Sequence, residues 1–358
     1  MLYRETGIFK TSYESDQALF PIPLDRWLVL VFLVLGFVVV PLLANEYLLQ
    51  AVLIPTVVFT MAALGLNLLT GYAGQLSLGT GAFMAVGAYA AYKLTTAFPD
   101  LNILVVFVIA GVIAAMVGVL FGIPSLRIKG FYLAVATLAA QFFLIWLFNK
   151  VAWFTNYDPS GSITAPPRTL LGIELTGPTA TAETRYLTAL AMVVVFTAIS
   201  LNLVRGRIGR AWMAIRDMDI AAEIIGFRLF HTKLLAFAIS SFYCGVAGAM
   251  MLFLWLGSAE TEAFAINISF QVLFMVIIGG LGSVLGSYLG AAFISLMPIV
   301  LTNLPELFGL HIEAAMGKHI EFMIFGGMII FFLIVEPHGL ARLWFIVREK
   351  LRRWPFPY

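Results

Sequence analysis

Five side chains in one apolar, glycine-rich part of the chain could contact a solute: Asn67, Gln75, Ser77, Thr80 and Phe83. The amides and hydroxyls form hydrogen bonds without carrying charge, and the aromatic ring offers an apolar wall. The glycines between them permit non-helical backbone, which inside a membrane is tolerated only where it lines a cavity or is buried in protein. Small residues also allow close helix contact. The pattern therefore predicts either helix packing or a path for a zwitterion or neutral polar solute.

The apolar segments lack groups that could catalyse a reaction or bind a metal. Glu46, Lys93 and Glu321 stand at segment ends, where long side chains reach the membrane interface. The histidines lie in or next to different loops without metal-ligand spacing: His231, His311, His319 and His338. The chain has no G-x-x-x-x-G-K-[ST] motif. We therefore expect no catalytic residue, no metal and no cofactor, and the lack of a buried carboxylate disfavours proton coupling.

A second group of residues lies in a long polar loop, 205–233, which reads RGRIGRAWMAIRDMDIAAEIIGFRLFHTK. Within it, 211–225 contains no Gly or Pro and alternates apolar with charged residues at mostly helical spacing. This predicts one amphipathic helix that ends at Gly226 as its C′ residue. The helix carries Arg216, Asp217 and Glu223. It could dock a cytoplasmic ATPase, or it could lie on the membrane surface and contact only lipid.

The composition is that of a membrane protein. The chain is 61% hydrophobic and 11% charged, with a mean hydropathy of +0.99, whereas soluble domains have about 25% charged residues. The net charge of +2 is small, and its basic part favours lipid headgroups and a cytoplasmic partner over nucleic acid. The single Cys244 excludes an intrachain disulfide and lies in an apolar run, where we expect it to be buried.

Crossing the hydrocarbon layer takes roughly 20 apolar residues, and about ten segments meet that need. We expect spans at 27–44, 48–69, 76–94, 103–122, 131–149, 186–204, 234–256, 267–281, 285–302 and 320–335. The segment 267–281 is short, so it could be tilted, broken or only partly spanning. The predicted fold is an all-α polytopic membrane protein.

Basic residues divide unequally between the two sides of these spans. With a cytoplasmic N-terminus, the inner loops and tails hold 16 of the 21 Lys and Arg residues and the outer side holds Lys93, Lys150, Arg168, Arg185 and Lys318. Basic residues are retained on the cytoplasmic side of short loops. We therefore expect an inner-membrane protein with both ends cytoplasmic. Its parts are a tail at 1–26, a transmembrane domain at 27–335 and a tail at 336–358, with 150–185 and 303–319 outside and 205–233 inside.

Several motifs, in order, carry a resemblance to a known family. They are NLLTGYAGQLSLGTGAFMAVGAY (67–89), PSLRIKGFYLAVATLA (124–139), GRIGRAWMAIRDMDIAAEIIG (206–226), FQVLFMVIIGGLGSVLGSYLGAA (270–292) and EPHGLARLW (336–344). The chain resembles the permease subunits of bacterial ABC importers for branched-chain amino acids, and most closely the LivM type, from about residue 48 to 345. One position departs from the pattern, because many relatives have His where this chain has Thr80.

The resemblance implies the larger, type II-like class of ABC importer permease, with about ten helices. It also implies a related permease chain as partner, two cytoplasmic ATPases and a periplasmic substrate-binding protein. The stretch 220–226 looks like the family's ATPase-coupling segment. That likeness assigns the coupling role to Ile220, Ala221, Ala222, Glu223 and Gly226, beside the charged Arg216 and Asp217.

The sequence therefore predicts a permease subunit that is not itself an enzyme and carries branched-chain or other apolar amino acids inward. Urea and short-chain amide permeases share much of the same pattern and remain an alternative. A stand-alone channel or a secondary transporter, including one coupled to sodium through backbone carbonyls, is a second alternative. A membrane-embedded enzyme is disfavoured, because the spans have no cluster of His, Asp or Glu.

Overall fold

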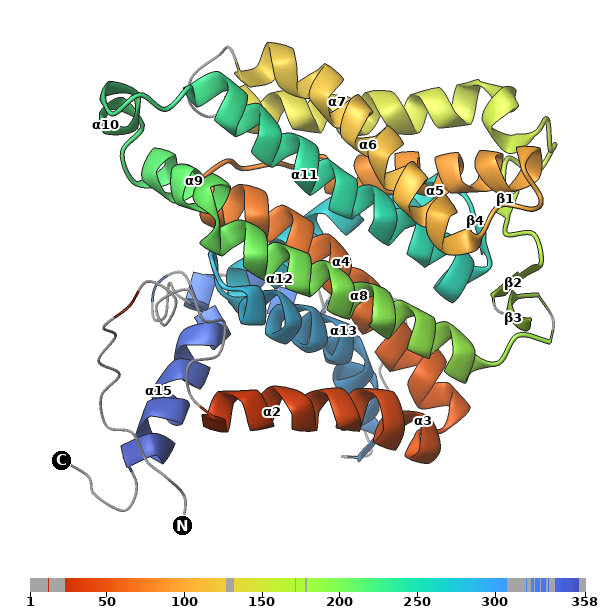
Figure 1. The fold of residues 1–358 in the computed structure, drawn as a ribbon. Coiled ribbons are helices and arrows are strands. Elements are labelled where there is room, and N and C mark those ends of the chain that lie inside the picture. The colour runs from red at the N-terminus through yellow and green to blue at the C-terminus, as the bar shows by residue number, and fades with distance from the viewer. Residues whose placement is uncertain are drawn as a thin grey trace.

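The chain folds into a bundle of long helices with two very short β-pairings, as Figure 1 shows. The computed structural model describes residues 12, 23–126, 132–170, 172–177, 179–307, 320, 323–324, 326–328, 330–332, 334 and 339–353. The predicted span 320–335 is therefore described only in part, and the predicted outer loop 303–319 lies largely outside the described residues. The same holds for most of the tail 1–26 and for parts of the tail 336–358.

The α-helices of the described residues are α2 (Pro23–Val34), α3 (Val40–Leu43), α4 (Ile54–Asn67), α5 (Thr80–Ala97), α6 (Ile103–Leu126), α7 (Tyr132–Lys150), α8 (Ala182–Arg205), α9 (Arg207–Asp217), α10 (Asp219–Ile224), α11 (Leu229–Met250), α12 (Ile266–Gly279), α13 (Val284–Leu307) and α15 (Gly339–Arg353). Wider π-helical turns extend several of them: η1 (Leu35–Val39), η2 (Leu48–Leu53), η3 (Leu68–Tyr72) and η5 (Met251–Leu256). Two 3₁₀ turns are η4 (Ala152–Thr155) and η6 (Thr261–Phe264).

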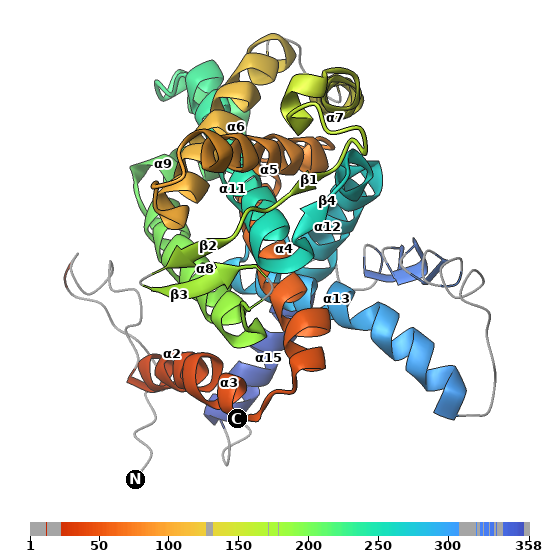
Figure 2. The same ribbon diagram turned by 90° about the vertical axis from the view of Figure 1, so that its right-hand side faces the viewer.

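The strands are short and gather in and beside the loop at 150–185. They are β1 (Ile163–Thr164), β2 (Arg168–Leu170), β3 (Ile173–Thr176) and β4 (Ser258–Ala259). β1 pairs antiparallel with β4, with Ile163 opposite Ala259, and β2 pairs antiparallel with β3. The long loop is therefore folded against the residues that follow η5 much later in the chain, and Figure 2 shows β1 beside β4.

The predicted spans agree well with the structure. Eight helical stretches of the described residues are long and apolar enough to cross a membrane. They are Arg26–Leu43, Leu48–Tyr72, Ile103–Leu126, Leu133–Lys150, Ala182–Arg205, Leu229–Leu256, Thr261–Gly279 and Val284–Leu301. The all-α polytopic fold is thus confirmed. α5 adds a less apolar helix of 18 residues, and the prediction that it would begin at 76 is wrong, because residues 76–79 are not helical.

The core of the bundle is formed by α11, which packs against α4, α5 and α6 (Figure 1). In the Leu48–Tyr72 and Leu229–Leu256 stretches, 83% of the apolar window is buried, against 0% for Arg26–Leu43. The inner helices approach very closely. A Cβ at Gly248 of α11 would lie 1.8 Å from the carbonyl oxygen of Met84 on α5. A small residue at this crossing lets the two backbones touch, as in other membrane helix pairs. Cys244 on α11 is buried, as expected.

The two ends of the bundle carry different parts of the chain. α9, α10 and α15 lie at one end, whereas the four strands lie at the opposite end (Figure 1). This agrees with the expectation that 205–233 and the C-terminal segment share one side of the membrane and 150–185 faces the other. Which end is cytoplasmic follows from the unequal distribution of basic residues and stays a prediction.

Thiol labelling tests this orientation. Single cysteines at Ser160 in the strand-bearing loop and at the exposed His231 beside α11 are placed in a Cys244→Ala background. In intact cells an impermeant thiol reagent added from outside should label Ser160→Cys and spare His231→Cys. Permeabilised cells serve as the control, where both positions should react. Labelling of His231→Cys in intact cells would reverse the orientation.

Candidate functional site

The helix break that precedes α5 is the most unusual part of the fold. After η3 ends at Tyr72, residues 74–79 run without helical hydrogen bonds until Thr80 begins α5. Gly74 has φ +67, a conformation that side chains rarely adopt. Gln75 and Ser77 are buried whereas Gly74 and Leu76 are exposed, so alternate residues of this irregular backbone face into the protein.

Side chains of two other helices satisfy the backbone N–H groups at the start of α5. The N–H of Leu78 donates to the hydroxyl of Thr137 at 2.9 Å. The N–H of Gly81 donates to the hydroxyl of Ser269 at 2.8 Å, and that of Ala82 to Oε1 of Gln141 at 2.6 Å. The first N–H groups of a helix have no partner within the helix, and without water they must find one elsewhere.

Sequence reasoning missed Thr137, Gln141 and Ser269. The signal was present, because each is an uncharged polar residue inside an apolar run of α7 or α12. Nothing in the sequence says which backbone groups such a side chain will meet. Gln141 joins all three elements, since its Nε2 also donates to the carbonyl of Phe264 just before α12, at 2.8 Å.

α12 also begins inside the bundle. Its helix has 14 residues, about 21 Å at 1.5 Å per residue, and is preceded by the extended residue Ala265. The predicted segment 267–281 is therefore one short helix, which the 3₁₀ turn η6 precedes. Ser269, in the first turn of α12, bonds to the start of α5. α5 and α12 therefore begin side by side inside the bundle.

The buried amide of Gln75 and hydroxyl of Thr80 have no hydrogen-bond partner within the described residues. Their exposed fractions are 6% and 1%. Buried polar atoms are normally paired. Phe83, one turn into α5, is also buried and packs edge-on against Phe237 with ring centroids 5.6 Å apart. Unsatisfied polar groups thus lie beside an aromatic wall at the helix break.

The structure does not bring Asn67 into this cluster by any direct contact. Its Oδ1 accepts from the N–H of Gly282 at 2.9 Å. Its Nδ2 donates to the carbonyl of Ser283 at 2.7 Å and to the hydroxyl of Ser287 at 3.0 Å. The whole amide is therefore occupied in holding the turn between α12 and α13. Ser77 has a weaker role within the break, where its hydroxyl accepts from the N–H of Gly79 at 3.4 Å.

The loop 205–233 contains two helices, so the prediction of one helix over 211–225 is wrong. α9 and α10 are separated at Met218, which has extended backbone (φ −159, ψ 92). Because of this break, α9 and α10 present their apolar side chains in different directions. Trp212 and Ile215 of α9 are buried, and the indole of Trp212 donates to the carbonyl of Thr232 at 3.1 Å.

α10 presents apolar side chains outward, at the end of the bundle where it projects (Figure 1). Met218, Ile220, Ile224 and Ile225 are between 69% and 82% exposed. Of the other predicted coupling residues, Glu223 is exposed, Ala221 is half-buried and Ala222 is buried against the protein. Gly226 has φ +103, which confirms its expected role as the residue that ends the helix.

Arg216 points inward, where it contacts the helix break. Its Nη1 donates to the carbonyl of Gly71 at 2.8 Å, and its Nε to Asp217 at 2.9 Å. A Cβ at Gly71 would meet the backbone nitrogen of Gly282 at 2.2 Å, and one at Gly282 would lie 3.4 Å from Nη1 of Arg216. The last turn of α9, the start of the helix break and the α12–α13 turn therefore meet at one junction.

The paired substitutions Asn67→Leu and Thr80→Val test this assignment of roles. Asn67→Leu leaves the Gly282 N–H and the Ser283 carbonyl without their partner, at roughly 1–3 kcal/mol for each buried group. Thr80→Val removes a hydroxyl that bonds to nothing in the described residues, so stability should be unchanged or slightly higher. Thermal unfolding in detergent measures both. A loss for Thr80→Val as large as that for Asn67→Leu would show that Thr80 has a structural partner.

Comparison with known proteins identifies the kind of chain. Residues 48–333 match the family described as branched-chain amino acid transport system / permease component. The high-affinity branched-chain amino acid transport system permease protein LivM of Escherichia coli is 31% identical over 305 residues, covering 80% of this chain and 68% of the relative. The LivM protein of Salmonella typhimurium is 30% identical, with the same coverage. No solved structure matches the chain.

Proposed function

This chain belongs to the branched-chain amino acid permease family, and from that premise we propose that it carries branched-chain or other apolar amino acids across the cytoplasmic membrane. It is a multi-pass permease subunit of an ABC importer and, as such, a transport component and not an enzyme. In our proposal the solute passes the helix break before α5, and ATP hydrolysis on partner chains drives its movement.

The observation that carries this proposal is the meeting of two helix beginnings inside the bundle, beside irregular backbone. Ser269 of α12 bonds to the N–H of Gly81 at the start of α5. Transporters place substrate sites where discontinuous helices meet at the midplane, because helix starts favour anionic groups such as a carboxylate. Irregular backbone at that depth is stable only when it lines a cavity or is buried in protein.

The chemistry around the break suits an amino acid with an apolar side chain. Gln75 and Thr80 offer unpaired hydrogen-bonding groups without formal charge, and Phe83 with Phe237 forms an aromatic surface. A zwitterion can bond to the amide and hydroxyl while its side chain packs on the rings. Urea has no apolar side chain that could pack on the rings. Its uptake is therefore measured beside that of leucine.

The transport of Thr80→Val tests the path. Because this change keeps size and removes hydrogen-bonding capacity, leucine uptake by the assembled importer should fall roughly tenfold, equivalent to about 1.4 kcal/mol. The matched control is Thr95→Val on the same helix, whose buried hydroxyl bonds to the carbonyls of Ala91 and Tyr92. It should transport normally once assembled. Normal uptake by Thr80→Val would remove Thr80 from the path, and urea uptake exceeding that of leucine would change the solute.

We place ATPase docking on α10. The apolar side chains on and beside this short helix are exposed. They belong to Met218, Ile220, Ile224 and Ile225. Apolar side chains grouped in this way at a protein surface mark contact sites. Asp217, Asp219 and Glu223 add carboxylates around it, and such groups favour a partner with a basic groove. The family resemblance also predicts a related permease chain as partner, and a periplasmic binding protein against the strand-bearing loop.

Arg216 connects this docking surface with the path. Movement of α9 and α10 acts directly on Gly71 through the guanidinium, and the same junction holds Gly282 between α12 and α13. One arginine therefore contacts the turn that leads into the helix break before α5 and lies beside the turn that follows α12. The N–H donors of a guanidinium lie in a fixed plane, so the bond from Arg216 to Gly71 depends on the orientation of α9 as well as on its distance.

Two substitutions separate docking from transmission. Ile224→Asp places a charge on the docking surface, so the ATPases should copurify in lower yield. Arg216→Gln should leave the ATPases bound but lower the amount of amino acid moved per ATP hydrolysed, at least several-fold. Arg228→Gln, an exposed cation on the same loop, is the control and should behave as wild type. Normal coupling in Arg216→Gln would exclude this arginine from the mechanism.

A further inference from the structure

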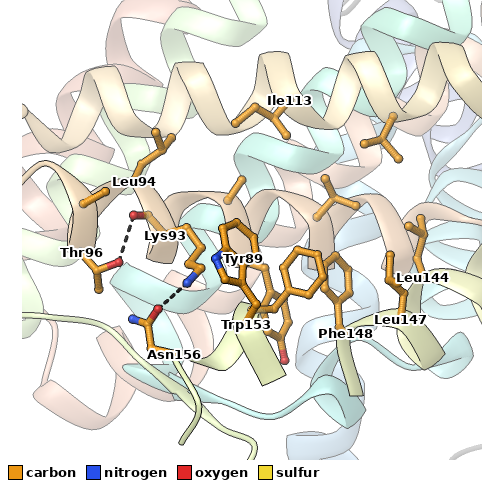
Figure 3. Close-up of a pocket in the computed structure, with 15 residues that line it drawn as sticks. Tyr89, Lys93, Leu94, Thr96, Ile113, Leu144, Leu147, Phe148, Trp153 and Asn156 are labelled. Atoms are coloured by element: carbon orange, nitrogen blue, oxygen red, sulfur yellow. Dashed lines mark hydrogen bonds between the residues drawn. The ribbon is translucent and has the colours of Figure 1, made fainter. Parts of the chain in front are cut away.

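A cleft of about 750 Å³ lies between α5, α6 and α7 (Figure 3). α5 forms its floor from Val86 to Ala97, whereas the path residues on α5 end at Phe83. α6 contributes Ile113 and Val117 to one wall, and α7 contributes Leu144 and Leu147 to the other. The walls are almost wholly apolar, and the volume lies in the range of small-ligand sites.

One end of the cleft is bounded by an aromatic contact between α6 and α7, and the other end by the residues that follow α7. Phe121 of α6 and Phe143 of α7 come together with ring centroids 6.0 Å apart. Neither lines the cleft, whose α6 and α7 residues lie farther toward the outer ends of these helices. Both helices are spans with apolar side chains facing away from the protein, among them Met116 and Trp146. A wedge between two such helices opens sideways into the hydrocarbon.

A single cation stands at the end of the cleft that the residues after α7 bound. Lys93, near the end of α5, extends its ammonium over the ring of Trp153 at 4.1 Å from the centroid and donates to Asn156 Oδ1 (Figure 3). Both partners are uncharged, and no carboxylate lies within ion-pair distance of Lys93 in the described residues. Lysine with tryptophan is the pair that membrane proteins place at the level of the lipid headgroups.

We propose that this cleft binds an anionic phospholipid of the outer leaflet, with its phosphate at Lys93 and one acyl chain between α6 and α7. The apolar wedge excludes water and matches hydrocarbon, while the uncompensated ammonium matches a negative headgroup. Asn156 is held by a second bond to the hydroxyl of Tyr92 at 3.0 Å, so the cation is kept at the mouth of the cleft. The left-handed backbone of Asn156 and Tyr157 turns the chain back at that mouth.

The amino acid substrate does not explain the cleft as well. A zwitterion at Lys93 would leave its ammonium group among leucine and phenylalanine side chains, where burial of an unpaired charge is strongly unfavourable. A phospholipid places only its acyl chain there. Because α5 forms the floor, the bound lipid contacts the helix whose other end begins at the path.

Lipid titration of the assembled importer in detergent tests the proposal, with the thermal unfolding midpoint and native mass spectrometry as readouts. Phosphatidylglycerol should stabilise the wild type at lower concentration than phosphatidylcholine. Lys93→Gln should reduce this preference by about fivefold, since one cation near a lipid surface contributes about 1 kcal/mol, and Lys93→Arg should retain it. Lys150→Gln, which removes another exposed lysine at a helix end, is the matched control.

Val117→Trp fills the cleft and should weaken both lipids while leaving the assembled complex intact. Glycerol phosphate without acyl chains should stabilise neither form. If Lys93→Gln and Lys150→Gln reduced the preference for phosphatidylglycerol equally, the attraction would be a general property of the surface and the proposed site would be overturned. Unchanged lipid binding in Val117→Trp would place the acyl chain elsewhere, and a wild type without preference would show that a protein partner covers the cleft.

Discussion

The need to satisfy every backbone N–H without water governs this structure. α5 begins inside the bundle with Thr80 buried, and its first N–H groups would be strongly destabilising there if unpaired. Thr137, Ser269 and Gln141 accept them from two neighbouring helices. This arrangement fixes α5, α7 and α12 relative to one another. It also leaves Gln75 and Thr80 as buried polar groups that the fold itself does not use.

The inner end of the bundle depends on contacts that only glycine permits. A side chain on Gly71 would displace the backbone of Gly282, and Gly282 itself has φ +74, which residues with a side chain rarely adopt. Asn67 and Arg216 then bind this pair from opposite sides through backbone atoms. The junction is small and directional, so a shift of α9 changes hydrogen bonds and does not merely deform soft packing. Such orientation-dependent hydrogen bonds suit a junction that passes movement of α9 to the spans, as in our proposal.

Much of the architecture is predictable because hydrophobic length and basic residues are properties of single segments. The eight spans, the buried Cys244 and the helix end at Gly226 follow from local composition. The cluster at the break is only half predictable. Glycines and polar residues predicted irregular backbone near 74–83, but the accepting side chains come from distant segments. The same limit explains α9 and α10, where periodicity continues across Met218 although the helix does not. The uncharged amide of Asn67 predicts a path residue, and only the structure shows the three groups to which this amide bonds.

The outward isoleucines of α10 have a consequence for the life of the subunit. Ile220, Ile224 and Ile225 remain uncovered in the folded single chain, so a copy without its cytoplasmic partner displays the kind of apolar patch that chaperones and proteases recognise. The signal disappears when the partner binds. In our proposal the docking surface on α10 is therefore also a mark of incomplete assembly.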